Sequence, residues 1–148
     1  MGTALIAAYR SSWRVYSETL EAVFRRTYVS SLGRPWVNSP AAARTDAIYR
    51  LSVGAAAPFL FALAILIALL KEWLPSLLPG RLAGYLFVAG FVIVGLATYV
   101  ILNRKFDGYE MSEAATREDR PLTRGEWWFG IASWGSIFGY IVLLVLYL

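Results

Sequence analysis

Three long runs of apolar residues occupy most of the chain after residue 50. They cover residues 51–70, 82–102 and 127–148, and none of them contains a charged side chain. A helix of 20 residues is about 30 Å long, which matches the hydrocarbon core of a bilayer, and it satisfies its own backbone groups where no water is present. The pattern therefore predicts an all-α membrane protein with three transmembrane helices.

The residues at the ends of these runs are of the kinds that anchor spans at a membrane surface. Tryptophan rings favour the headgroup level, and long cationic side chains extend toward the headgroups. The first run is followed by Lys71 and Trp73, the second by Arg104 and Lys105, and the third opens with Trp127 and Trp128. These flanking residues support the predicted span ends.

Local sequence signals predict where two of the helices begin. Ser39 before Pro40 is typical of a helix N-cap followed by proline at the first helical position, so a helix is expected to start there and run on into the first span. Thr123 and Glu126 have the spacing of a capping box, in which each side chain accepts a hydrogen bond from the other residue's backbone amide. Pro58 is expected to kink the first span.

The first 38 residues are expected to form an amphipathic helix and a loop, separate from the three-span region at 39–148. Apolar residues recur at steps of three and four from Tyr9 to Phe24, and charged residues occupy the opposite stripe. Gly33, followed by Arg34 and Pro35, should end this helix. Such a helix lies at a membrane interface or against a partner protein.

The positive charges indicate an orientation. Residues 1–50 contain seven Lys and Arg, the first loop contains two and the loop at 103–126 contains five. By the positive-inside rule, the N-terminus and the 103–126 loop face the cytoplasm or the mitochondrial matrix, and the C-terminus lies on the opposite side. Residues 1–17 are basic, contain serine and lack acidic residues, as in mitochondrial import signals and some bacterial membrane proteins. An inner membrane of either kind is predicted.

The residues that carry most catalytic and cofactor chemistry are missing. The chain contains no Cys and no His, and no ionisable group other than tyrosine lies inside the three runs. No cofactor and no enzymatic activity are therefore expected. Six acidic residues between Asp107 and Glu126 alternate with arginines, and this pattern is interpreted as a solvated, salt-bridged loop, with a short helix from Ser112 to Asp119.

Small residues in the spans predict contacts between helices, because they allow backbones to approach closely. Such residues share one face of the third span, and two glycines eleven residues apart share a face of the second: Ala132, Gly135, Ser136 and Gly139, and Gly84 with Gly95. Ala57, Ala64 and Ala68 have heptad-like spacing in the first span. Three helices cannot bury all of these faces, so other membrane protein subunits are the expected partners.

Cations near one membrane surface are candidates for binding anionic phospholipid headgroups. They are Arg44, Arg50, Arg104, Lys105 and Arg124. Their spread beside the apolar runs fits lipid better than nucleic acid, and no nucleic-acid partner is predicted.

The sequence leaves two functional hypotheses open. The first is a non-catalytic accessory subunit of a larger, energy-transducing membrane complex, which would contribute to assembly, packing and lipid contacts. The alternative is a bacterial immunity protein that neutralises a membrane-active toxin.

Overall fold

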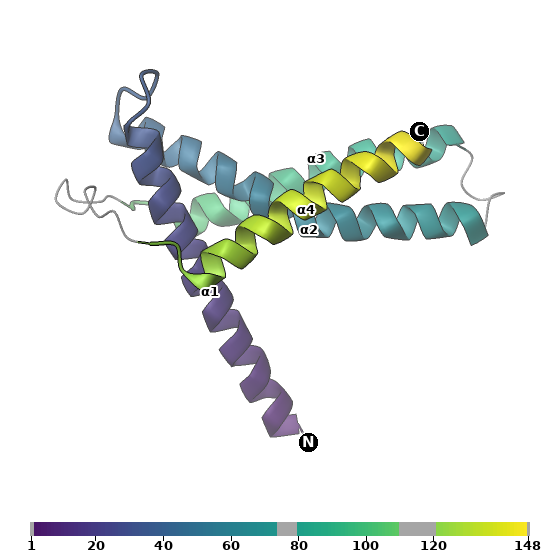
Figure 1. Ribbon diagram of the computed structural model, residues 1–148, viewed down its shortest axis with the longest axis horizontal. Coiled ribbons are helices and arrows are strands. Elements are labelled where there is room, and N and C mark those ends of the chain that lie inside the picture. The colour runs from purple at the N-terminus through teal and green to yellow at the C-terminus, as the bar shows by residue number, and fades with distance from the viewer. Residues whose placement is uncertain (1, 74–79, 110–120, 148) are drawn as a thin grey trace. The chain divides into compact units, whose positions relative to one another are not determined.

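The computed structural model describes residues 2–73, 80–109 and 121–147, and these residues form four helices and no strand (Figure 1). The helices are α1 (Gly2–Leu32), α2 (Pro40–Trp73), α3 (Gly80–Lys105) and α4 (Arg124–Tyr147). The predicted all-α class is confirmed. By length and composition α2, α3 and α4 can each cross a membrane, which makes the chain an integral membrane protein.

Both predicted helix starts are confirmed by their hydrogen bonds. The amide of Ala42 donates to Ser39 Oγ at 3.2 Å, and α2 begins at Pro40 and continues through Pro58. At α4, the amide of Glu126 donates to Thr123 Oγ1 at 3.2 Å, and the amide of Thr123 donates to Glu126 Oε2 at 2.8 Å. The capping box is therefore complete in both directions.

The first helix ends where the sequence predicts, but its amphipathic character is not confirmed. α1 stops at Leu32, and the amide of Arg34 donates to Ser31 O at 3.1 Å. Leu20, Phe24 and Tyr28 form a buried stripe, whereas Trp13 is 61% exposed. From residue 11 onward, the face of α1 that is buried in the protein begins at Leu20.

The chain divides into two compact units that cut across the boundary predicted at residues 38 and 39. Unit 1 contains residues 1–51 and 108–129, and unit 2 contains residues 52–107 and 130–148. α2 contributes its first turns to unit 1 and its remainder to unit 2, and α4 is divided in the same way. The predicted turn at 74–79 and the predicted helix at 112–119 lie outside the described residues.

Unit 1 is built from large side chains on α1 and small ones on the start of α2. Phe24 and Tyr28 are completely or almost completely buried, as are Ala43 and Ala47. The Tyr109 ring packs edge-on against Phe24, with ring centroids 5.1 Å apart. Alanine on one helix leaves room for the aromatic rings of the other, so the two helices pack closely.

Unit 2 has a small core to which all three spans contribute. Ala64 and Ile67 of α2 and Ala83 and Phe87 of α3 are buried together, and Tyr140 of α4 packs against them. Ala57, Ala64 and Ala68, expected to share a packing face, are all buried. Yet only 11% of the most apolar part of α3 and of α4 is buried, against 39% for α2. Most of the apolar surface of α3 and α4 therefore faces outward.

Candidate functional site

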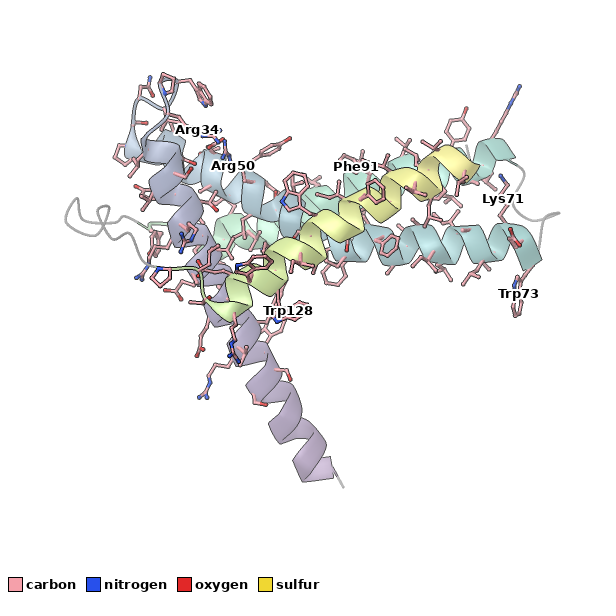
Figure 2. The ribbon with its side chains drawn as sticks, in the orientation of Figure 1. Arg34, Arg50, Lys71, Trp73, Phe91 and Trp128 are labelled. Atoms are coloured by element: carbon pink, nitrogen blue, oxygen red, sulfur yellow. The ribbon has the colours of Figure 1, made fainter. Side chains whose placement is uncertain are left out.

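Asp46 is the centre of a polar cluster that joins α1 to α2 in unit 1. The fully buried Ser31 hydroxyl donates to Asp46 Oδ2 at 2.6 Å, and Arg50 Nε lies 3.0 Å from the same oxygen. Arg34 Nη1 is 4.0 Å away, so two guanidinium groups approach one carboxylate (Figure 2). Charge-assisted hydrogen bonds of this kind fix the angle between two helices.

Glu126 forms a second polar link, between α1 and the start of α4. Its side chain is only 2% exposed, and its Oε1 accepts a hydrogen bond from Arg26 Nε at 3.1 Å. Its Oε2 is the capping-box acceptor for Thr123, so both carboxylate oxygens have donors. The expectation of a solvated loop is wrong for this residue, because the ion pair with Arg26 and the cap hold the carboxylate in the interior.

Gly125 allows α1 to lie directly against the N-terminus of α4 within unit 1. A Cβ atom at this position would come within 2.6 Å of Thr19 Oγ1 and 3.3 Å of Thr19 Cγ2. Thr19 is held in place because its hydroxyl donates to Val15 O at 2.9 Å. A larger residue at 125 would therefore push the two helices apart.

Two side-chain hydrogen bonds connect the spans of unit 2. Proline has no N–H, so Pro58 deprives the carbonyl of Gly54, four residues earlier, of its helical partner. The buried Ser133 hydroxyl of α4 donates to that carbonyl oxygen at 2.9 Å. The Tyr140 hydroxyl donates to Phe87 O of α3 at 3.0 Å. The sequence signal that could have located one of these acceptors is Pro58, because a proline marks the carbonyl four residues earlier, here that of Gly54, as lacking its helical donor.

The predicted headgroup residues occupy different environments. Arg104, Lys105 and Arg124 are exposed near the end of α3 or the start of α4, and Arg44 is half-buried. Arg50 is paired with Asp46, so only part of its guanidinium is available to another anion. The structure brings Arg50 close to Arg34, which the sequence did not single out, because both approach Asp46. Their contact with lipid remains a prediction.

The predicted packing residues also differ from one another. Gly139 lies against the Phe61 ring of α2, and Gly84 is buried. Ala132 and Gly135 are exposed, and Ser136 is half-buried. A Cβ at Gly135 or at Gly95 would meet no atom within 4 Å. One end of the small face of α4 is thus used inside unit 2, and the other end is open.

No known protein supplies a function for this arrangement. Among residues 2–73, 80–109 and 121–147, no group of three or more His, Cys, Asp or Glu side chains is arranged to hold a metal ion. No protein-family model, curated protein or solved structure matches the chain. Function must therefore be argued from the exposed surfaces and the polar links.

Proposed function

We propose that the chain is a non-catalytic accessory subunit of a larger membrane protein complex, and that its role is in assembly. The observation that carries this proposal is the open small-residue face of α4 at Ala132 and Gly135. Lipid tails pack equally well against large side chains, whereas a neighbouring helix gains close backbone contact from small ones. The lack of His and Cys in the whole sequence further favours a structural role.

The small internal core of unit 2 supports the same proposal. Because α3 and α4 bury so little of their apolar surface, they have room for further helices without rearrangement. We expect a partner helix to pack along Ala132 and Gly135, while Gly139 keeps its contact with Phe61. The partner would then extend the bundle from the side of α4.

A substitution that fills the open face tests this proposal. A Cβ at position 135 would meet no atom within 4 Å, so Gly135→Leu should leave helical content and the stability of the isolated protein unchanged. It should abolish stoichiometric co-purification of other membrane subunits in mild detergent, measured by native gels and mass spectrometry. Gly130→Leu is the matched control, because its Cβ also meets open space but lies on a different side of α4.

Two outcomes would contradict the accessory-subunit proposal. The first is a Gly135→Leu variant that keeps the same partners in the same amounts. The second is a native chain that purifies without partners and protects cells from one membrane-active toxin, which would favour the immunity-protein hypothesis.

We further propose that the protein belongs to a mitochondrial or bacterial inner membrane, with its N-terminus on the matrix or cytoplasmic side. The support is the uneven distribution of Lys and Arg along the sequence. Because the chain has no cysteine, Ala115→Cys and Leu77→Cys can be labelled separately with an impermeant reagent. We expect labelling from opposite sides of the membrane, and labelling of both from one side would contradict the topology.

A further inference from the structure

The packing face of α1 continues beyond the part of the helix that is buried. Leu20, Phe24 and Tyr28 follow one another at four-residue steps and are buried. Tyr16 and Trp13 extend the same stripe toward the N-terminus at steps of four and three, but they are 37% and 61% exposed. Their rings lie together, with centroids 6.0 Å apart. An aromatic pair therefore lies at the N-terminal side of the buried stripe, with both rings partly exposed.

Contacts within unit 1 relate the position of Trp13 and Tyr16 to the start of α4. Thr19 lies against Gly125, and Gly125 is two residues before Trp127. Trp127 and Trp128, which are 60% and 69% exposed, begin the last membrane-spanning helix. Tryptophans at the start of a span mark the headgroup level. Trp13 is six residues from Thr19, about 9 Å along the helix, so it remains close to that level.

We propose that the N-terminal half of α1, residues 2–18, lies on the lipid surface at which α4 begins, with Trp13 and Tyr16 inserted among anionic phospholipid headgroups. Rings with an apolar body and a polar group suit this boundary. Residues 2–18 contain two arginines and one acidic residue, Glu18, so this segment has a net positive charge that complements a negatively charged leaflet. The inference is independent of the proposed function, because it requires a bilayer and no other subunit.

The polar face of the same helix agrees with this arrangement. The Arg14 and Glu18 side chains are 80% and 69% exposed and lie 3.7 Å apart. They project from a different side of α1 than Trp13, as expected for a helix with one face in lipid and another in water.

Spin labels on the full-length protein test the inference. Single cysteines are introduced by Trp13→Cys, Tyr16→Cys, Glu18→Cys or Trp36→Cys into a chain that has none. Each labelled variant is reconstituted in nanodiscs of phosphatidylcholine alone or of equimolar phosphatidylcholine and phosphatidylglycerol. Electron paramagnetic resonance then compares collisions with oxygen, which concentrates in lipid, and with a water-soluble nickel complex.

We expect the oxygen-to-nickel ratio at positions 13 and 16 to exceed the ratio at positions 18 and 36 several-fold, and to rise with phosphatidylglycerol. Position 36 is a suitable reference because Trp36 is 67% exposed in the loop between α1 and α2. The Tyr16→Cys variant keeps Trp13, so loss of the Trp13 ring cannot by itself explain a negative result.

Three results would overturn the inference. Ratios at 13 and 16 equal to the ratio at 36 would mean that the helix stands in water. Protection of both positions from both reagents would mean that a second copy of the protein covers them. An equal ratio in the two lipid compositions would rule out recognition of anionic headgroups.

Discussion

The two compact units use different polar contacts to hold their helices together. In unit 1, carboxylates link the helices: Glu126 of α4 pairs with Arg26 of α1, and Asp46 of α2 accepts a hydrogen bond from Ser31 of α1. In the spans of unit 2, neutral hydroxyl groups donate to backbone carbonyls, as Ser133 does to Gly54 and Tyr140 to Phe87. The predicted runs carry no charged residue, so ion pairs are not available within them.

The difference follows from the solvent that each unit has to suit. A charge at the bilayer centre is costly to desolvate, whereas near the headgroups it keeps contact with water. Backbone carbonyls are present in every helix. A carbonyl that has lost its helical N–H donor is the one best able to accept a hydrogen bond from a side chain of another helix. A single chain can therefore hold one group of helices together with ion pairs, and another with hydrogen bonds from side-chain hydroxyls to backbone carbonyls.

The largest effect is expected from removing the cation of the buried pair in unit 1. Arg26→Met leaves the Glu126 carboxylate, 2% exposed, without its cation and should destabilise the packing of α1 by about 3 kcal/mol. Amide hydrogen exchange at residues 20–32 should then accelerate about a hundredfold. Exchange in α3 should remain unchanged.

The neighbouring arginine provides the matched control. Arg25 is 46% exposed, lies 3.9 Å from the surface residue Glu21 and donates from Nε to the Tyr109 hydroxyl at 3.3 Å. Neither partner is a buried charge, so Arg25→Met should cost about 1 kcal/mol, clearly less than Arg26→Met. If the Arg25 and Arg26 variants exchanged at the same rate, burial of Glu126 would not govern the stability of unit 1.

A smaller effect is expected from removing the hydrogen bond between the Ser133 hydroxyl and the Gly54 carbonyl in unit 2. Ser133→Ala leaves the Gly54 carbonyl without a donor and should cost about 1 kcal/mol, measured by unfolding in mixed detergent micelles. In a Pro58→Ala background the amide of residue 58 becomes available to Gly54 O. The cost of Ser133→Ala should then fall by at least half.

The dependence of the Ser133→Ala cost on residue 58 distinguishes the replacement of a missing backbone donor from ordinary side-chain packing. Ser136→Ala, about one turn further along α4, should show no dependence on residue 58. Equal costs of Ser133→Ala in both backgrounds would mean that the Ser133 hydroxyl does not replace the missing donor.

The smallest effect is expected at Asp46, where water reaches the ion pair. Asp46→Asn removes the charge but keeps an oxygen acceptor for Ser31, so the loss should be about 1 kcal/mol or less. High salt should reduce the stability of the native α1–α2 contact and have little effect on the variant, because salt screens exposed charges. Hydrogen exchange at residues 24–32 would measure both effects, and an equal salt response in the two proteins would contradict the role of Asp46.

Much of the fold could be predicted because its signals are local. Length and apolarity define the spans, and the caps at Ser39 and Thr123 depend on residues at most three positions apart. The division into units could not be predicted in the same way. Unit 1 joins segments far apart in the chain, as the Arg26–Glu126 pair across 100 residues illustrates, and no pattern along one helix pairs them.

The candidate site was predicted less well for the same reason. The sequence identifies Gly135 and Gly139 as small, but only the packing of Phe61 distinguishes the filled position from the open one. Likewise, Arg50 has the position of a headgroup ligand, and its four-residue spacing from Asp46 on α2 allows their pairing, whereas the approach of Ser31 and Arg34 to Asp46 depends on tertiary packing.

The Arg26–Glu126 pair also has a consequence for the order of biosynthesis. Arg26 is synthesised 100 residues before Glu126, which at ordinary translation rates corresponds to about 5–20 s. During this interval the first helix can pair with the start of α2 through Asp46, but not yet with α4. Unit 1 is completed only once the ribosome has delivered residues 108–129, so a chain that stops earlier lacks the carboxylate with which Arg26 pairs.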